Sequence, residues 1–345
     1  MKKFGKKSLV VKMLLLVLSV IFILSGCSGK SIVEVEPTAE PTKDPQALEI
    51  EAFFNRYVNT DERPVAVMID NDDKNSRPHA GLNEAYLIYE LVVEGGATRF
   101  MALFRGVDTE KIGPVRSSRH YFLDYALEHD VIYTHFGWSP RAQQDIPALG
   151  VNNINGVTGN DAGIFWREEK YKGDWHSAFT SIEKIRSHAE AKGYKMETQN
   201  QGSIKYADKY ISLTSSVTAN SVSLPYSTHY RTGYTYNSET GLYEKSINGA
   251  PHVMQSGEVL AVKNIIVQLI PDTALGDGSA RRNINSIGSG KGYYITGGAC
   301  EEITWTKSSR SGDTIYKRAD GSELLVNPGK TIVNIIAPAS AIVIE

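Results

Sequence analysis

The chain has 345 residues, with 37 basic and 39 acidic side chains and a formal net charge of −2 at pH 7. A balance so close to neutral argues against a general nucleic-acid binder, which needs a strong excess of positive charge. With two cysteines in the whole chain, a small scaffold held together by several disulfides is also excluded.

The first 27 residues have the pattern of a bacterial lipoprotein signal. Five lysines precede an apolar run from Met13 to Leu24, which has the length of a signal peptide and is short for a bilayer span. The run ends in Leu24-Ser25-Gly26-Cys27, a lipobox. We therefore expect cleavage after residue 26 and diacylation of Cys27 by palmitate-type chains, because two chains anchor a protein stably. The alternative is a transmembrane anchor with an incidental cysteine.

Cleavage changes the charge and the cysteine count of the mature protein. Residues 1–26 contain five of the 37 basic residues and none of the 39 acidic ones, so removing them leaves 32 basic residues and a formal charge of −7. An acidic protein of this kind is not expected to bind nucleic acid. With Cys27 acylated, Cys300 has no intramolecular partner, and it is predicted to be a small buried residue rather than a nucleophile.

Residues 27–60 are predicted to be a tether between the membrane and the folded part. The stretch from Ser28 to Pro45 is rich in Pro, Thr and Glu and shows little hydrophobic periodicity, as is typical of extended linkers. Ala47 to Tyr57 has amphipathic character and is either a short helix or the end of the tether.

An N-terminal domain of α/β or α+β type is predicted over residues 61–200. Pro64 to Asp70 is an apolar run between polar turns and predicts a buried strand. Tyr86 to Val93 and Thr98 to Phe104 flank Glu94-Gly95-Gly96-Ala97, which suits a hairpin that is buried on both faces. Glu94 and Arg99, beside this turn, either line a site or pair with each other.

The exit of the first strand is acidic, with Asp70, Asn71, Asp72 and Asp73 in succession. Such carboxylates can bind a divalent cation, but Lys74 stands where a calcium loop needs an oxygen ligand. We therefore predict no metal and no cofactor, and keep a divalent cation as the weaker alternative to a plain polar turn.

Ile112 to Trp138 is the stretch with the densest chemistry. Gly113-Pro114 is followed by Arg116, Ser117, Ser118 and Arg119, and Ser117 or Ser118 is predicted to cap a helix. Arginines at a helix start oppose the helix dipole, so their placement suggests a function. We predict an anion site at these four residues. The alternative is that the arginines are partners of the carboxylates at 70–73.

Catalytic roles are weaker hypotheses. His120 and His135 are possible acids or bases, although a single histidine is more often packed or hydrogen-bonded. Ser117 is a possible nucleophile, but capping is the commoner role. The motifs G-x-S-x-G and H-E-x-x-H and the P-loop are absent from the sequence.

Two further helices are marked by their ends. Ser139 and Pro140 are predicted to start one that stops at Gly150, while Thr180 and Glu183 form a capping box for another that ends at Gly193. Aromatic residues between them are candidates for stacking on sugars or for burial. They are Phe165, Trp166, Tyr171 and Trp175.

Residues 201–345 are predicted to form a β-rich domain. Short alternating runs are separated by turns, which indicates a mostly antiparallel sheet or barrel. Asp272 to Gly292 is glycine-rich and reads either as a loop that folds over a neighbouring site or as a surface loop. Asn327 to Lys330 is predicted to be a tight turn before the final strand.

The chain resembles the YerB-like lipoproteins of Gram-positive bacteria. The resemblance covers residues 64 to about 345 and rests on PVAVMIDN, RPHAGLNEA, YELVVEGGATRFMALF, IGPVRSSRHYF, HFGWSP and NPGKT. It implies a lipoprotein with two adjacent domains of unknown function, of which the second is β-rich. It implies no activity and no catalytic residues.

Three functions are compatible with these observations. The first is a lipoprotein on the extracytoplasmic face of the membrane that binds an anionic cell-wall polymer or an envelope protein through Arg116 and Arg119. The second is an envelope hydrolase or transferase acting on a phosphodiester or glycosidic bond. Arg116 and Arg119 would then hold the phosphate, with Asp70, Glu94, Arg99, His120 or His135 in the chemistry. The third is a receptor for a soluble ligand.

Overall fold

The computed structural model describes residues 44–72, 74–168, 176–214, 217–338 and 341–345. The expected signal peptide, Cys27 and most of the expected tether lie outside these ranges. Residues from Lys43 onward belong to one compact unit. It opens with α1 (Pro45–Phe53) and a π-helical turn (Phe54–Val58), so the segment predicted as either helix or tether is helical.

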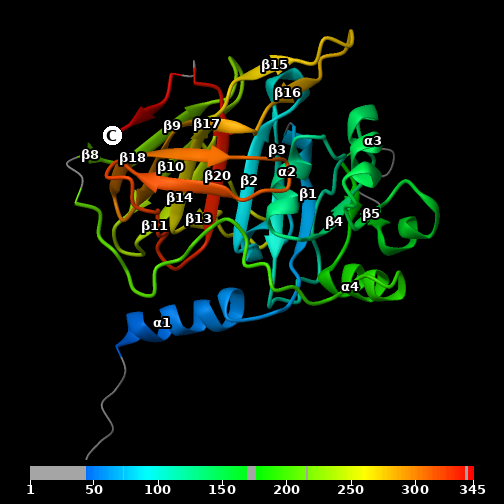
Figure 1. The fold of residues 1–345 in the computed structure, drawn as a ribbon, viewed down its shortest axis with the longest axis horizontal. Coiled ribbons are helices and arrows are strands. Elements are labelled where there is room, and N and C mark those ends of the chain that lie inside the picture. Colours follow the sequence, from blue (N-terminus) through cyan, green and yellow to red (C-terminus); the bar gives the residue numbers. More distant parts are fainter. Residues whose placement is uncertain (1–43, 73, 169–175, 215–216, 339–340) are drawn as a thin grey trace, which may run out of the picture. The chain divides into compact units, whose positions relative to one another are not determined.

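The largest element in the described part of the chain is an eleven-stranded mixed sheet (Figure 1). Its order is β19-β18-β17-β14-β20-β2-β3-β1-β4-β5, with β8 paired to β18. The first half of the chain contributes β1 (Val65–Asn71), β2 (Leu87–Val92), β3 (Thr98–Phe104), β4 (Ile132–His135) and β5 (Asn153–Asn155). The second half contributes β8 (Val217–Thr218), β14 (Asn264–Leu269), β17 (Gly288–Thr296), β18 (Ala299–Lys307), β19 (Thr314–Arg318) and β20 (Thr331–Ile336).

The first half mixes helices and strands, while the second half consists mostly of antiparallel strands, as the sequence predicts. The two halves share the sheet, because β20 pairs in parallel with β2 on one side and with β14 on the other. The boundary expected near residue 200 therefore separates two sequence segments whose strands are hydrogen-bonded side by side.

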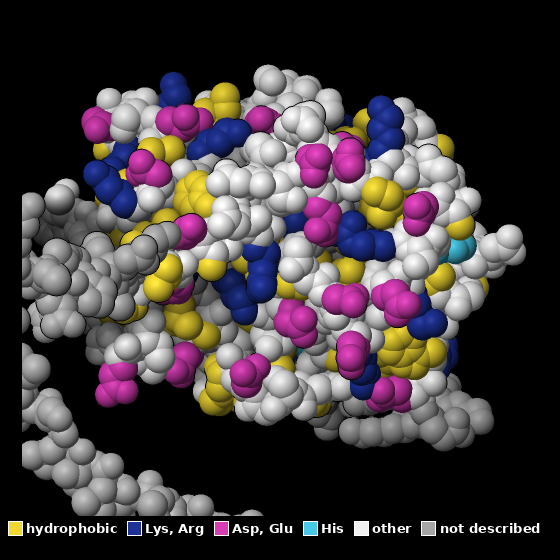
Figure 2. Space-filling model, turned by 90° about the horizontal axis from the view of Figure 1, so that it is seen from below, with side chains coloured by type: hydrophobic (Ala, Val, Ile, Leu, Met, Phe, Trp, Pro, Cys, Tyr) yellow, Lys and Arg dark blue, Asp and Glu magenta, His cyan; other side chains and the backbone are white. Residues whose placement is uncertain are grey.

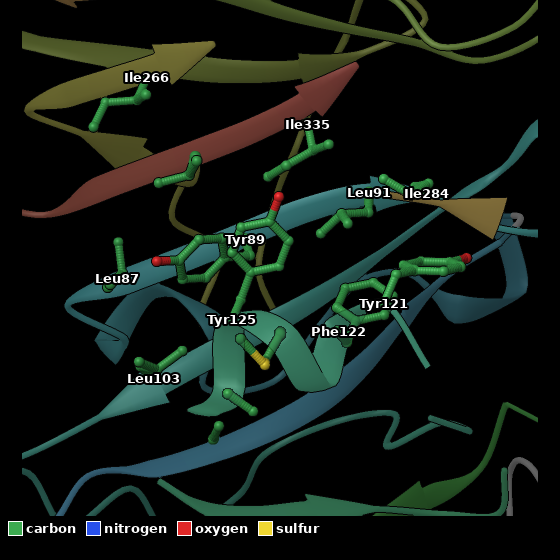
Figure 3. Packing of buried hydrophobic residues seen from close by; sticks show 14 of the residues in the cluster. Leu87, Tyr89, Leu91, Leu103, Tyr121, Phe122, Tyr125, Ile266, Ile284 and Ile335 are labelled. Atoms are coloured by element: carbon green, nitrogen blue, oxygen red, sulfur yellow. The ribbon is translucent and has the colours of Figure 1, made fainter. Parts of the chain in front are cut away.

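Both faces of the sheet are covered, which explains the near-continuous apolar strands. The hairpin β2–β3 is buried along its whole length, as predicted. On one face, Leu87, Tyr89 and Leu91 of β2 pack against Tyr121 and the helix α2 (Phe122–Glu128) (Figure 3). The other face carries Ile88 and packs against α4 (Ile182–Ala191) and the second sheet. One strand therefore supplies both cores by simple alternation.

The second sheet has six strands among the described residues, in the order β12-β11-β10-β9-β21 with β13 paired to β11. These are β9 (Ser221–Pro225), β10 (Arg231–Asn237), β11 (Leu242–Ile247), β12 (Ala250–Pro251), β13 (Ala261–Val262) and β21 (Val343–Ile344). Two short antiparallel pairs complete the β structure of the described residues, β6 (Trp166–Arg167) with β7 (Ala178–Phe179), and β15 (Asp272–Ala274) with β16 (Arg282–Ile284), the latter a hairpin. Part of the glycine-rich loop expected at 272–292 is thus a hairpin.

The predicted helix ends are partly right. The helix α3 (Pro140–Ala148) starts with Ser139 as its cap, whose hydroxyl accepts from the Ala142 N–H at 3.3 Å, and Gly150 follows with a φ of 65°. The cap of α4 is Ser181 rather than Thr180, because the Ser181 hydroxyl accepts from the Lys184 N–H.

Ser117 and Ser118 do not cap a helix, and this prediction is wrong. The helix α2 begins at Phe122, and its N-cap Tyr121 makes no side-chain capping bond. The backbone of residues 116–118 is instead hydrogen-bonded to the segment that follows β4. Phe136 N–H donates to Arg116 O at 2.9 Å, and Ser118 N–H donates to Gly137 O at 3.0 Å. The carbonyls of Arg116 and Ser118, which a helix starting here would use as acceptors, instead accept from the N–H groups of Phe136 and Ser139.

Among the described residues, no helix combines the length and the apolar character that a membrane span requires. Acidic and basic side chains are intermixed on the face seen from the α1 side (Figure 2). That face shows no broad basic patch of the kind that binds nucleic acid.

Candidate functional site

The ends of β1 and β3 bring Asp70 and Arg99 together. The antiparallel register pairs these two residues directly, and both are buried. Directly opposed residues have their Cβ atoms roughly 5 Å apart, which suits a charge pair. The Arg99 Nη2 lies 3.9 Å from Asp70 Oδ1, and its Nη1 donates to Ser117 O at 2.5 Å.

Arg116 reaches the same carboxylate from the other side. The segment before it runs along β1, where Arg116 N–H donates to Met68 O at 2.8 Å and Asp70 N–H donates to Pro114 O at 2.9 Å. This backbone pairing fixes Arg116 next to Asp70, and its Nε donates to Asp70 Oδ2 at 3.0 Å. The predicted alternative, that these arginines bind the carboxylates at 70–73, therefore holds for Arg116.

Arg119 pairs with Glu94 at the turn between β2 and β3. The contact is bidentate, with Nε to Oε1 at 2.6 Å and Nη2 to Oε2 at 2.7 Å. Partial burial would raise the pKa of Glu94, but the hydrogen bonds and charge of Arg119 outweigh it and lower that pKa. Of the two alternatives predicted for Glu94 and Arg99, pairing with each other is not observed, since each binds a different partner.

Glu94 and the three arginines line a cavity of about 310 Å³, which we call the arginine pocket. One wall is the tip of the β15–β16 hairpin. The hairpin is attached to the protein core by Ile284, which lies in the same apolar cluster as Leu91 and Tyr121 (Figure 3). The lining residues are Asp72, Val93, Glu94, Arg99, Arg116, Arg119, Ser279, Ala280 and Arg281.

The pocket holds hydrogen-bond donors that the described residues leave unused. Arg116 donates to Asp70 through its Nε alone, and its two terminal nitrogens make no hydrogen bond with a described residue. The buried Nε of Arg99 likewise has no acceptor in the described part of the chain. A buried donor without a partner costs about 1–3 kcal/mol. The terminal nitrogens of Arg116, rather than this enclosed atom, are the donors that a ligand in the pocket can reach.

Asp70 stays ionised between these groups. Burial alone would raise its pKa, but a hydrogen bond from His176 Nδ1 and the charges of Arg99 and Arg116 lower it to about 2. Burial together with the neighbouring Arg119 lowers the pKa of Arg99 to about 10, which still leaves it charged at neutral pH.

The other predicted residues lie away from the pocket lining. His135 is fully buried on β4, where its Nδ1 lies 2.7 Å from Gly137 O, and burial lowers its pKa to about 4. His120 is mostly buried, and its Nε2 lies 3.1 Å from Asn283 Oδ1 on β16. Ser117 and Ser118 contribute backbone oxygens, which accept hydrogen bonds from Arg99 and Arg119.

The hydroxyl groups of these two serines are also engaged elsewhere. Ser117 Oγ donates to Phe136 O at 3.0 Å, and Ser118 Oγ accepts from Tyr133 OH at 2.8 Å. Both contacts turn the hydroxyls toward β4 and the segment that follows it. The serines therefore position the arginines through their backbone.

No group of three or more His, Cys, Asp or Glu side chains among the described residues is arranged to hold a metal ion. Asp70, the first carboxylate of the proposed cation loop, is bound by arginine and histidine. Cys300 is buried, as predicted, and burial raises the pKa of its thiol to about 12.

A larger cavity of about 500 Å³ lies beside α1 and contains none of the site residues predicted from the sequence. Its charged groups include Glu258, Lys263 and Lys330, and the amine of Lys330 is bound to Asn83 O. The arginine pocket is the stronger candidate, because it combines the predicted residues with the terminal nitrogens of Arg116, which bind no other described residue.

Sequence reasoning missed His176 and the contribution of Arg281. His176 stands 106 positions from Asp70 and follows no motif, so nothing in the sequence connects the two. Arg281 lies in the glycine-rich stretch 272–292, which the sequence predicts only as a loop. The register of β1 with β3, once known, would have placed Arg99 opposite Asp70.

Comparison with known proteins agrees with this architecture. Residues 55–195 match the model described as "Protein of unknown function (DUF3048) N-terminal domain", and residues 222–333 match the corresponding C-terminal domain. "Putative lipoprotein YerB" of Bacillus subtilis (strain 168) is 31% identical over 326 residues, covering 93% of this chain and 94% of that protein. The crystal structure of YerB from Bacillus subtilis superimposes with a TM-score of 0.72 at 30% identity, covering 82% of this chain and 94% of that chain. The chain belongs to the DUF3048 family, whose two domains it contains in order.

Proposed function

We propose that this protein is a lipoprotein on the extracytoplasmic face of the cell membrane that binds an anionic group of a cell-wall polymer, or of an envelope protein, in the arginine pocket. The lipobox at Leu24–Cys27 supports the anchor, and the relative from Bacillus subtilis carries the name of a lipoprotein. Diacylation at Cys27 would hold the pocket within reach of the wall.

The single observation that carries the binding proposal is that the guanidinium of Arg116 is only partly hydrogen-bonded within the protein. Its guanidinium lines the pocket and keeps both terminal nitrogens available, although its Nε is fixed on Asp70. A guanidinium held in this way has lost most of its conformational freedom before the ligand arrives, so little entropy is lost on binding. Hydrogen bonds from a charged donor contribute about 1.5–3 kcal/mol each.

Binding is tested with the full lipoprotein in non-ionic detergent micelles, sedimented with insoluble wall material. We expect retention that falls as salt rises, because charge pairs at a partly exposed site are screened. Arg116→Ala, alone or with Arg119→Ala, should abolish retention. Arg231→Ala, which removes an exposed arginine from β10 and changes the net charge equally, is the matched control. The proposal is refuted if retention is the same at low and high salt and is the same for the wild type and Arg116→Ala.

The anchor has its own test. Mass spectrometry of the membrane fraction should find the chain beginning at a diacylated Cys27. A retained Met1, or an unmodified Cys27, contradicts lipidation. The proposal that the pocket binds an anion does not depend on this result.

A second function, hydrolysis or transfer at a phosphodiester or glycosidic bond, is favoured by one observation. His176 Nδ1 is hydrogen-bonded to the buried carboxylate of Asp70, an arrangement that orients an imidazole for acid or base chemistry. Soluble products released from wall material by the wild type, and lost in His176→Gln, would establish it. Retention without products, in the presence and absence of divalent metal, leaves binding as the function.

A further inference from the structure

We infer that the cavity beside α1 is a second binding site, which takes a small amphiphile with one apolar chain and one acidic group. We call it the helix cavity. Its volume of about 500 Å³ lies within the range of small-molecule sites. It shares no lining residue with the arginine pocket, so this inference is independent of the function proposed above.

The helix cavity lies between α1 and the part of the chain that follows residue 200, with Asn83 also in its lining (Figure 1). Aromatic contacts hold the α1 wall in place. The ring centroid of Phe53 lies 4.9 Å from that of Tyr206, and the ring of Tyr57 stacks on that of Tyr86 at 5.3 Å between centroids. Both walls of the cavity therefore belong to the same folded unit.

The walls of the helix cavity are largely apolar. Apolar side chains come from α1, from β11, from the segment around β13 and from the turn before β20. They are Ile50, Phe53, Leu242, Val259, Ala261 and Pro328. Most of them are only half-buried. An apolar chain that covers them removes this surface from water, which favours binding.

Lys263 places a positive charge beside these walls. Its Nζ makes no hydrogen bond and no ion pair with any residue that the structure describes. The amine lies 4.9 Å from the centre of the Tyr210 ring, which lines the same cavity. A cation–π contact orients an ammonium group without using its acceptor-seeking N–H groups on the side away from the ring.

The neighbouring chain fixes the backbone and the stem of Lys263. Its N–H donates to Lys330 O at 2.9 Å. The stem passes over Gly329, where a Cβ atom would lie 2.6 Å from the Cβ of Lys263, so a side chain at 329 would collide with it. Because the stem is held in this way, less conformational entropy is lost when the amine binds an anion.

The other lysine of the cavity is already compensated. The amine of Lys330 donates to Asn83 O, and burial lowers its pKa although the charge of Glu258 opposes this shift. Glu258 in turn accepts from Asn83 Nδ2 at 2.7 Å. Lys330, Asn83 and Glu258 thus form a connected polar group at one end of the cavity.

Two further charges, Arg56 and Glu49, stand on the α1 side, are exposed and have opposite signs. Lys263 is therefore the charge of the lining that lacks a counterpart among the described residues. A carboxylate or phosphate group can accept from its amine while an attached chain lies along the apolar walls. A basic or neutral head group gains no such contact.

The cavity is also close in sequence to the expected lipid anchor. α1 begins at Pro45, and the residues between Cys27 and Pro45 span at most about 60 Å. Under the lipidation proposed above, an amphiphile from the membrane would be within reach of the cavity. The acidic group belongs either to a free fatty acid or to the head group of a membrane lipid, and the experiment separates the two.

The test is equilibrium dialysis of labelled octanoate against the full lipoprotein in phosphatidylcholine nanodiscs, with empty nanodiscs as background. We expect saturable binding, with octanol and octyltrimethylammonium about fivefold or more weaker as competitors. Each buried methylene group changes affinity about fourfold, so hexanoate, which lacks two of them, should compete at least about tenfold more weakly.

Two pairs of variants locate the site. Lys263→Met keeps the stem and removes the charge, so octanoate should bind about fivefold more weakly. Lys317→Met, at an exposed lysine of β19, is its control and should bind as the wild type does. Ala52→Trp adds bulk to the α1 wall and should abolish binding. Leu48→Trp, at an exposed position of the same helix outside the lining, should leave it unchanged.

The inference is overturned if octanoate shows no saturable binding, if octanol or octyltrimethylammonium competes as well as octanoate does, or if binding survives both Lys263→Met and Ala52→Trp. Competition by short-chain phosphatidylglycerol, but not by short-chain phosphatidylcholine, assigns the site to a lipid head group. Competition by neither assigns it to a free acid. Wall retention through Arg116 is measured separately, so either result leaves the proposed function to its own test.

Discussion

Arg116 holds Asp70 through Nε alone, at 3.0 Å from Oδ2, so the same guanidinium is fixed by the fold and open to a ligand. Asp70 is therefore a structural partner of the pocket as well as a source of opposing charge. Stability and affinity are expected to respond in opposite directions when that charge is removed.

Asp70→Asn should strengthen anion binding while it weakens the fold. The neutral amide keeps the shape of the side chain but no longer offsets the arginines, so affinity for an anionic ligand should rise about fivefold, or about 1 kcal/mol. Sedimentation of the variant and the wild type with the same wall material measures the change. Weaker binding by the variant would mean that Asp70 is needed mainly to position the arginines.

The same residue should give the protein a defined acid sensitivity. Its folded pKa of about 2 lies below the ordinary value of 3.8. The ionised carboxylate therefore stabilises the folded state fully above pH 3.8, and this contribution is lost as the pH falls toward 2. It amounts to about 2 kcal/mol. Urea unfolding at pH 5, 4 and 3 should show a steeper loss for the wild type than for Asp70→Asn, and parallel curves would contradict this.

A pair of buried histidines should add a second pH range in which the folded protein loses stability. His79 Nδ1 lies 2.7 Å from His252 Nε2, and burial lowers the pKa of His79 from 6.5 to about 4 and that of His252 well below 6.5. The unfolded chain binds protons below pH 6.5 that the folded chain cannot accept. Stability is therefore complete above pH 6.5 and falls between pH 6.5 and 4, by about 3 kcal/mol for His79 alone.

Thermal or urea unfolding between pH 7.5 and 4.5 measures this effect. His252→Gln should be less stable at pH 7.5 but should lose less stability on acidification. A wild-type curve that is flat from pH 6.5 to 4.5 would show that the pair takes up protons inside the folded protein.

The buried pair of Lys245 and Glu90 should be intolerant of single substitution. Both side chains are fully buried, Lys245 Nζ lies 3.2 Å from Glu90 Oε2, and Thr98 and Thr232 donate to Oε1. Lys245→Met leaves an uncompensated carboxylate and should cost about 3–5 kcal/mol. Adding Glu90→Gln should restore part of that loss. Chemical denaturation of the two single variants and the double variant gives the coupling energy, and additive losses would argue against the pair.

The fold was predictable from sequence wherever the signal is local. The hairpin β2–β3 has apolar runs on either side of two glycines, and the structure gives Gly95 and Gly96 the positive φ values that such a turn requires. Ser139, Pro140 and Gly150 mark α3 because capping depends on neighbours within four residues.

Prediction failed where distant segments decide the local structure. Ser117 and Ser118 resemble a cap, but hydrogen bonds to Phe136 and Gly137 keep that segment extended until Phe122. The charge of the site was anticipated from Arg116 and Arg119. Asp70, Glu94 and Arg99 were also predicted as site candidates, whereas His176 and Arg281 were not, because distant segments such as β1 and the β15–β16 hairpin come together only through strand pairing and tertiary packing.

The position of β20 has a consequence for how the protein matures. This strand follows every other strand of the large sheet in the sequence, yet it lies between β14 and β2, near the middle of the sheet. Until residues 331–336 are available, the two halves of the sheet have no strand to join them, and each exposes an apolar edge. The large sheet therefore closes only after nearly the whole chain is free to fold, and under the export proposed above that point would come late in the passage across the membrane.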